Sequence, residues 1–200
     1  MNTRLQVEHP VTEMITGTDL VAWQLAVASG KPLPKAQNEL SIQGHAIEVR
    51  IYAENPENDF LPAAGSLWRL KQPAENANIR IDTGVIQGDE VGVFYDPMIA
   101  KLIVWGETRT IAIQRVQQAL GEYKIAGVTT NVDFLRRLIA VPAFREAILR
   151  TDFIEQHRRE LFNHQDHTIT LAQTGLYLTL APVSQGATLE MATRKPQIDS

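Results

Sequence analysis

The polar stretch NTRLQVEHPVTE occupies residues 2–13. If it forms a strand, its side chains alternate between two faces, and Asn2, Arg4, Gln6 and Glu8 share one of them. Two amides, a guanidinium and a carboxylate are an unusual set for a strand face that only meets water. The pattern therefore favours either a functional polar face or a half-buried edge strand with a polar outer side.

Helix signals follow this stretch. Residues 11–16 are predicted to form a helical turn that Gly17 closes. A second helix is expected to start at a cap supplied by Thr18 or Asp19 and to run to about Ser29. A proline-containing linker then suggests a domain boundary.

Beyond the linker, strands dominate. Residues 46–53 alternate, with Ile47, Val49 and Ile51 on one face and Arg50 on the other. Further strands are predicted at residues 66–71, 79–82, 90–95 and 98–105. Short strands at this spacing predict an antiparallel sheet or a small barrel.

The period then changes to that of helices. Helices are predicted at residues 108–123, from a cap at Thr130 or Asn131 to about 139, from 142 onward and at 153–161, with a short strand at 124–128. The fold class predicted for this part is α+β. Residues 168–180 suit either a helix or a strand, and the composition after residue 182 is typical of a linker.

Composition narrows the function classes. The 200 residues carry a net charge of −4 and no cysteine, which argues against a nucleic-acid partner and excludes disulfides and thiolate chemistry. No apolar run approaches the roughly 20 residues that cross a bilayer, so no membrane partner is expected. No phosphate-binding or dinucleotide glycine pattern occurs.

Several motifs together resemble biotin carboxylase, the ATP-grasp component of biotin-dependent carboxylases. They are residues 1–13, 44–54, 60–62, 95–103 and 127–131. The resemblance runs to about Leu161 and implies the C-terminal part of such a protein, with Met1 inside a longer chain. It implies the end of an ATP-grasp domain at residues 1–40, the biotin carboxylase C-terminal domain at 41–161 and a tail at 162–200.

The resemblance also implies a reaction and its residues. Biotin carboxylases use ATP to carboxylate biotin with bicarbonate by way of carboxyphosphate. Arg4 is then expected to hold bicarbonate, with Gln6 and the backbone of Val7 on its other oxygens. Glu8 is expected to act as the general base, and Arg50 to stabilise the enolate oxygen of biotin.

The residues alone leave other interpretations open. Glu8 suits a structural ion pair with Arg4, and Arg50 suits a surface pair with Glu48. Asn2 matches a family position that binds ATP-bound magnesium or manganese, but the glutamate that precedes it in the family is missing, so this metal site is incomplete. His9 is expected to be packed and hydrogen-bonded rather than catalytic.

Three more positions carry expectations from the resemblance. Lys101, within the motif at residues 95–103, is expected to be structural. Arg80 matches an arginine at a bacterial homodimer interface, but its neighbours differ. His164 and His167 are interpreted as part of a solvated cluster rather than a metal site.

Within the family, residues 82–85, 101–106 and 151–157 resemble methylcrotonoyl-CoA carboxylase α subunits. The implied partners are a biotinyl carrier domain, which carries the biotin, and a carboxyltransferase β subunit, and a homo-oligomer remains open. The implied location is the cytoplasm, or the mitochondrial matrix in a eukaryote. The fragment alone is expected to be inactive. The alternative is a non-catalytic scaffolding or oligomerisation module that keeps the carboxylase fold.

Overall fold

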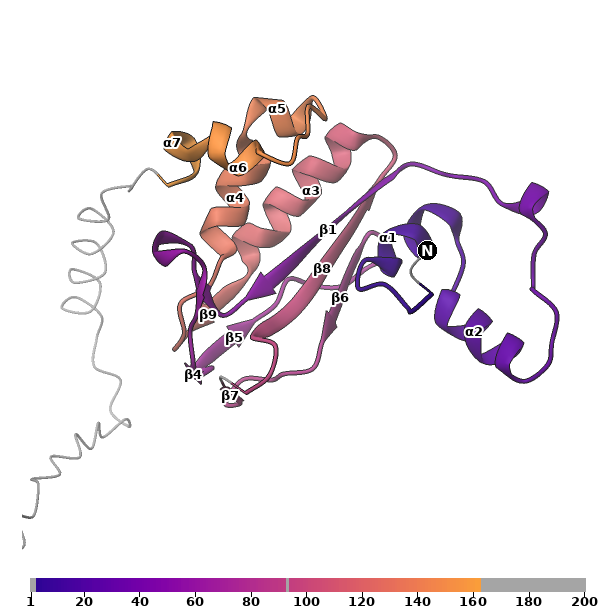
Figure 1. Ribbon diagram of the computed structural model, residues 1–200, viewed down its shortest axis with the longest axis horizontal. Helices are drawn as coiled ribbons and strands as arrows, with labels where there is room; N and C mark the ends of the chain where they lie inside the picture. The colour runs from indigo at the N-terminus through magenta and orange to yellow at the C-terminus, as the bar shows by residue number, and fades with distance from the viewer. Residues whose placement is uncertain (1–2, 93, 163–200) are drawn as a thin grey trace, which may run out of the picture. The chain divides into compact units, whose positions relative to one another are not determined.

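The computed structural model describes residues 3–92 and 94–162 (Figure 1). Its first half contains α1 (His9–Thr16), α2 (Leu20–Ala28), η1 (Gln37–Glu39), β1 (His45–Tyr52), β2 (Glu54–Asn55), η2 (Pro56–Asn58), β3 (Leu61–Pro62), β4 (Gly65–Ser66), β5 (Arg69–Lys71) and β6 (Ile79–Thr83). Its second half contains β7 (Glu90–Val91), β8 (Met98–Gly106), α3 (Arg109–Glu122), β9 (Lys124–Ala126), α4 (Val132–Ala140), α5 (Pro142–Arg145), α6 (Phe153–Gln156) and α7 (Arg158–Leu161). The predictions for Asn2, for His164 and His167 and for residues 168–200 lie outside the described residues.

The centre of the fold is an antiparallel sheet in the order β1-β8-β6. Ile47, Val49 and Ile51 of β1 are buried, as the alternating pattern predicts, and they pack in one core with Val116 of α3. Figure 1 shows α3 running along the sheet. The opposite face of the sheet carries charged side chains, which makes it the polar side of a two-layer α+β arrangement.

Shorter antiparallel ladders complete the strand part, pairing β2 with β3, β4 with β7 and β5 with β9. The single strand predicted at residues 66–71 is wrong: β4 and β5 are separate because they pair with different partners. The strand predicted at 90–95 is also too long. Among the described residues of this stretch, Glu90 and Val91 alone pair, with the two residues of β4.

The helix predictions hold better. Gly17 ends α1 in the left-handed conformation, and the Asp19 side chain caps α2 by accepting from the Ala22 amide. The charged helix predicted at residues 153–161 is divided at His157 into α6 and α7. Phe153 and Leu161 are nevertheless both buried, in a second core cluster.

The strand predicted at the start of the chain is wrong in this structure. Residues 3–8 form an irregular segment that ends in a turn at Val7 and Glu8, and within the described residues no strand pairs with them. Local hydrogen bonds hold this segment: the Gln6 side-chain Nε2 donates to the Arg4 carbonyl at 2.9 Å, and the His9 backbone N–H donates to the Gln6 carbonyl at 3.2 Å. A segment without a neighbouring strand satisfies its backbone through such local bonds.

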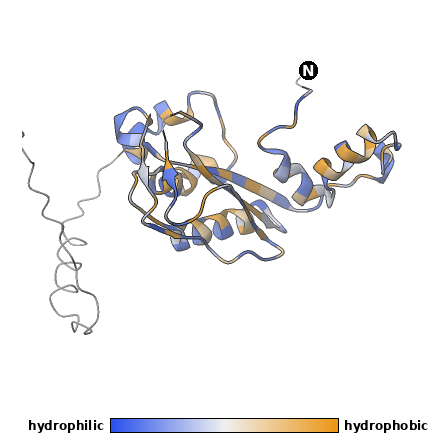
Figure 2. Cartoon of the chain, turned by 90° about the horizontal axis from the view of Figure 1, so that it is seen from below, coloured by the Kyte–Doolittle hydropathy of each residue, from blue (hydrophilic) through white to orange (hydrophobic). Residues whose placement is uncertain are grey.

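Helix α2 is apolar around its whole circumference, yet none of its residues is buried. Its Leu25 is 66% exposed, and Figure 2 shows the hydrophobic colouring of this helix at the right. A helix that is hydrophobic on all sides is normally buried in a protein core. The described residues therefore leave the surface of α2 uncovered. None of the helices described has the length and apolar character of a membrane span.

Candidate functional site

The polar face of the sheet meets the segment of residues 3–8. Arg50 Nη2 lies 2.9 Å from Glu8 Oε2, in an ion pair between residues 42 positions apart in the chain. Their side chains are 39% and 58% exposed, so the pair is reached by solvent. Because Val49 is buried in the core and side chains alternate along a strand, the neighbouring Arg50 points to the opposite, polar face.

Arg50 has a second acidic neighbour on its own strand. Its Nε lies 3.8 Å from Glu48 Oε1, and the Glu48 side chain is only 5% exposed. Burial raises the pKa of Glu48, and the positive charges of Lys101 and Arg50 oppose that rise. Arg50 thus contacts both the local acid Glu48 and the distant Glu8.

Lys101 anchors the turn to the sheet from the middle strand. It is buried, its Nζ lies 2.9 Å from Asp82 Oδ2, and it donates to the Val7 carbonyl at 3.1 Å. In register it stands opposite Arg50 on β1 and Asp82 on β6. The structural role expected for Lys101 is therefore a specific one: it fixes the residue next to Glu8.

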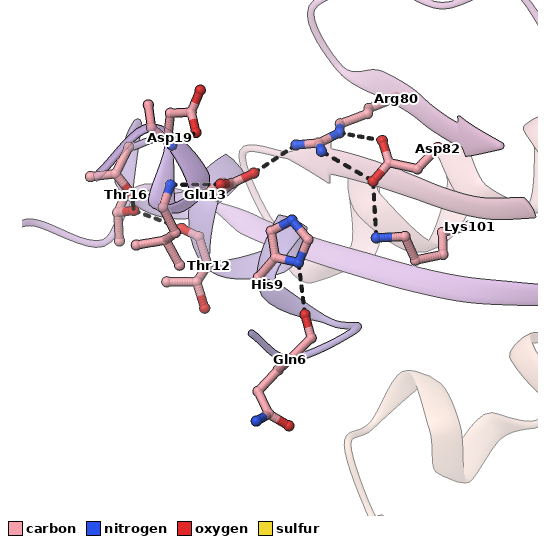
Figure 3. A network of polar contacts seen from close by, with 12 residues as sticks. Gln6, His9, Thr12, Glu13, Thr16, Asp19, Arg80, Asp82 and Lys101 are labelled. Carbon is pink, nitrogen blue, oxygen red and sulfur yellow. Dashed lines mark hydrogen bonds and ion pairs between the residues drawn. The ribbon is translucent and has the colours of Figure 1, made fainter. Parts of the chain in front are cut away.

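Helix α1 is held to the same face by a chain of charges that Figure 3 shows. Arg80 Nη1 lies 2.7 Å from Glu13 Oε2, and its Nε and Nη2 bind the two oxygens of Asp82 at 2.7 and 3.0 Å. The other Glu13 oxygen accepts from the Leu20 amide at 2.7 Å. In this chain Arg80 therefore joins the sheet to both α1 and the start of α2.

These contacts shift the pKa of Asp82. Burial opposes its ionisation and is the largest single influence, but hydrogen bonds from Arg80 and Lys101 together outweigh it, so the pKa lies below its usual value. The Arg80 guanidinium is in turn held in its charged form, chiefly by its hydrogen bonds to Asp82, with its pKa raised.

A groove of about 710 Å³ lies beside the turn. Arg4, Gln6 and Glu8 line it on the polar side, and Trp23 and Val27 of α2 line it on the apolar side. Arg4 Nη1 also donates to the Leu5 carbonyl at 3.4 Å. The groove thus presents a guanidinium, an amide and a carboxylate to the same space.

The predicted site residues fall into two places. Arg4, Gln6 and Glu8 line one groove, and Arg50 joins them through its contact with Glu8. The Val7 carbonyl is bound by Lys101 instead. His9 is partly buried and its Nδ1 lies 2.7 Å from the Gln6 carbonyl, which confirms the packed histidine (Figure 3). Among the described residues, no group of three His, Cys, Asp or Glu is placed to hold a metal ion.

Sequence reasoning missed two contributors. Asp82 binds Arg80 and Lys101, and Glu13 binds Arg80, although the sequence predicts no role for either acid. The signal for Asp82 was its spacing, since Arg80 and Asp82 are two residues apart on one strand and share a face. No local pattern connects Glu13 with a strand 67 residues later.

Two family models match the chain. The biotin carboxylase C-terminal domain matches residues 48–156, and the ATP-binding domain of the carbamoyl-phosphate synthase L chain matches residues 1–36. The mitochondrial methylcrotonoyl-CoA carboxylase subunit alpha of Mus musculus is 56% identical over 161 residues, which is 80% of this chain and 22% of that protein. A biotin carboxylase of Halalkalibacterium halodurans is 52% identical over 157 residues, covering 78% of this chain and 34% of its own length.

Solved structures agree with these matches. The biotin carboxylase domain of 2-oxoglutarate carboxylase from Hydrogenobacter thermophilus, in complex with MgADP, ADP and bicarbonate, has a TM-score of 0.79 and 39% identity, covering 82% of this chain and 36% of that one. Urea carboxylase from Kluyveromyces lactis has a TM-score of 0.71 and 43% identity, covering 76% of this chain and 13% of its own. The chain spans about a fifth to a third of the length of the curated relatives named above.

Proposed function

Because the chain belongs to the biotin carboxylase C-terminal domain family, we propose that it forms part of an active site that carboxylates biotin with bicarbonate and ATP. The observation that carries this proposal is the contact between Arg50 and Glu8 at 2.9 Å. Glu8 lies in the segment matched by the ATP-binding model, and Arg50 lies in the segment matched by the carboxylase model. A site built from both segments suits a reaction that joins ATP chemistry to biotin.

The proposed domains follow the same division. Residues 1–40 are the C-terminal end of an ATP-grasp domain, residues 41–161 are the biotin carboxylase C-terminal domain, and residues 162–200 are a tail. The match of the ATP-binding model to residues 1–36 supports the first boundary. The uncovered apolar surface of α2 supports it too, because a larger domain is needed to bury such a helix.

The proposed roles follow from charge and shape. Arg4 holds bicarbonate, since a guanidinium fork matches a planar anion, and the Gln6 side chain and the Val7 backbone N–H hold its other oxygens. Glu8 takes the proton from the bicarbonate hydroxyl, and Arg50 stabilises the negative charge on the biotin ureido oxygen. When bound, ATP supplies the phosphoryl group that activates bicarbonate.

Magnesium prefers several oxygen ligands, and the described residues hold no acidic cluster that fits it. Asn2, the residue proposed to contribute one ligand, lies outside the described residues. No step is therefore assigned to the metal here.

The finer assignment is an acyl-CoA carboxylase, methylcrotonoyl-CoA carboxylase in particular. Its support is the identity of 56% to the mouse α subunit and 52% to the Dictyostelium discoideum one. The partners proposed on this basis are a biotinyl carrier domain and a carboxyltransferase β subunit. The mitochondrial matrix is the proposed compartment if the source is eukaryotic, and the cytoplasm otherwise.

A chimera tests the proposal. The matching segment of the mouse α subunit is replaced by this chain's residues, and bicarbonate-dependent ATP hydrolysis is measured with free biotin. We expect turnover in the chimera, its loss in Glu8→Gln, and none above background for residues 1–200 alone. Glu90→Gln, at an exposed position on β7, is the control and should retain turnover. A folded but inactive chimera would instead favour the scaffolding alternative.

A further inference from the structure

Glu48 is a buried carboxylate that the proposed chemistry does not use. It lies on β1 two residues before Arg50, on the same face of the sheet. Its Oε2 atom is buried and has no hydrogen-bond partner among the residues that the structure describes. A buried carboxylate oxygen left without a partner is costly, so its retention calls for a physical explanation.

The Arg50 guanidinium lies between two carboxylates. Its Nη2 is at full hydrogen-bonding distance from Glu8, 2.9 Å, while its Nε is 3.8 Å from Glu48. An approach of about 1 Å is enough to turn the second contact into a charge-assisted hydrogen bond. Lys101 does not compete for this place through a short contact, because its described partners are Asp82 and the Val7 carbonyl.

The present arrangement differs from the one that the proposed chemistry needs. Glu8 Oε2 is occupied by the hydrogen bond from Arg50. The space between Glu8 and Arg50, which substrate needs, is closed by their direct contact. Arg50 must therefore move away from Glu8 before bicarbonate and biotin can lie between them.

We propose that Glu48 is the alternative partner of Arg50, so that Arg50 moves from Glu8 to Glu48 when bicarbonate and biotin enter. This inference rests on the proposed function. Glu48 is then a positioning residue that acts through Arg50 and does not itself touch substrate. The move frees Glu8, opens the space beside it and leaves the outer guanidinium N–H groups for the ureido oxygen. A side chain can alternate between two positions when each position offers it a partner, and here both partners of Arg50 are carboxylates.

The charged groups around Glu48 suit this role. Arg50 from β1 and Lys101 from β8 favour its ionised form, while burial, Glu8 and Asp82 disfavour it. A closer cation would therefore stabilise the ionised form of Glu48. Arg50 supplies that cation only after it leaves Glu8.

The test uses the chimeric carboxylase described above and measures kcat and KM for free biotin separately, at saturating ATP and bicarbonate. In Glu48→Gln, Arg50 loses its second carboxylate and stays on Glu8, so biotin has to displace that contact. We expect the KM for biotin to rise by roughly 10- to 100-fold while the KM for ATP stays unchanged. A merely structural role would lower kcat and leave the KM for biotin in place, which would overturn the proposal.

Further variants separate the alternatives. In an Arg50→Ala background, Glu48→Gln should cause almost no further loss, because the two residues act as a unit; additive losses overturn the inference. If Glu48→Gln does not fold, Glu48→Met removes the same charge without burying an unpaired polar atom and carries the same expectations. Glu54→Gln is the matched control, since burial also raises the pKa of Glu54, but its partner is Asn131. It should leave the KM for biotin unchanged.

The proposed function has its own readout. An inactive wild-type chimera, or normal turnover in Glu8→Gln, overturns the function and this inference together. An active chimera that loses turnover in Glu8→Gln but shows an unchanged KM for biotin in Glu48→Gln overturns this inference alone.

Discussion

Lys101 and Asp82 face each other on the paired strands β8 and β6, with the Lys101 ammonium 2.9 Å from Asp82 Oδ2. The same ammonium donates to the Val7 carbonyl at 3.1 Å, and Arg80 binds both oxygens of the same carboxylate. One aspartate thus orients two cations, and one of these cations fixes the residue next to Glu8. The place of the proposed base depends on a carboxylate 74 positions later in the sequence.

Asp82→Asn is therefore expected to destabilise the chain at neutral pH. The loss should be about 1.5–3 kcal/mol, the range for hydrogen bonds to charged groups. Because folding lowers the pKa of Asp82, its contribution is present above the unfolded value near 3.8 and is lost as pH falls through the folded value. Urea unfolding of the variant and the wild type between pH 2.5 and 7 should show a gap that narrows toward the acid end.

The control for this experiment is Asp59→Asn. Asp59 is exposed and has a left-handed backbone, which asparagine also tolerates. We expect it to change the free energy of unfolding by less than about 0.5 kcal/mol. A gap for Asp82→Asn that stays constant down to pH 2.5 would contradict the role given to its carboxylate.

The sequence predicts strands and helix ends correctly where they depend on residues that are neighbours in the chain. The alternation of residues 46–53 and the caps of α1 and α2 are examples, because strand period and turn chemistry are local properties. The first stretch shows the limit. Its period of two is that of a strand, but ladder bonds need a neighbouring strand. Among the described residues none is present, and residues 3–8 are irregular with a turn at their end.

Asn131 shows the same limit for a single side chain. The sequence predicts that it or Thr130 caps α4, and Asn131 does occupy the N-cap position, but its side chain makes no capping bond. Instead its Oδ1 accepts from the Tyr52 amide, and its Nδ2 donates to the Arg50 carbonyl and to Glu54. These partners lie about 80 positions earlier, so no local rule finds them.

Asn131→Ala should consequently cost more than the loss of a helix cap. It leaves an amide and a carbonyl at the end of β1 without their partners, and we expect about 2–4 kcal/mol of destabilisation. Guanidinium chloride unfolding measures this loss. Asn38→Ala, at an exposed position in η1, is the control and should stay within about 0.5 kcal/mol. A loss of only about 1 kcal/mol for Asn131→Ala would return Asn131 to the role of a simple cap.

Replacing glycine by alanine is expected to have opposite effects on stability at Gly127 and at Gly121. Gly127 has φ of +111°, and a Cβ there would collide with the Ser66 carbonyl oxygen. Gly127→Ala should therefore destabilise the protein by at least about 2 kcal/mol, which is the cost of backbone strain at such a position. Gly121 lies within α3 with open space around it, so Gly121→Ala should stabilise by about 0.5–1 kcal/mol. Thermal unfolding of both variants should move the midpoint in opposite directions, and equal shifts would contradict this geometry.

Glu8→Gln is the sharpest test of the proposed base. The amide keeps the size of the side chain and accepts a hydrogen bond from Arg50, so the segment of residues 3–8 should persist. It does not accept a proton from bicarbonate, and loss of a general base typically costs about 10²–10⁴-fold in rate. In the chimeric carboxylase, biotin-dependent turnover should fall by that factor while the KM for ATP stays unchanged, with Glu90→Gln measured alongside. Near-normal turnover in Glu8→Gln would reduce the contact with Arg50 to a structural ion pair, which at this exposure contributes at most about 1 kcal/mol.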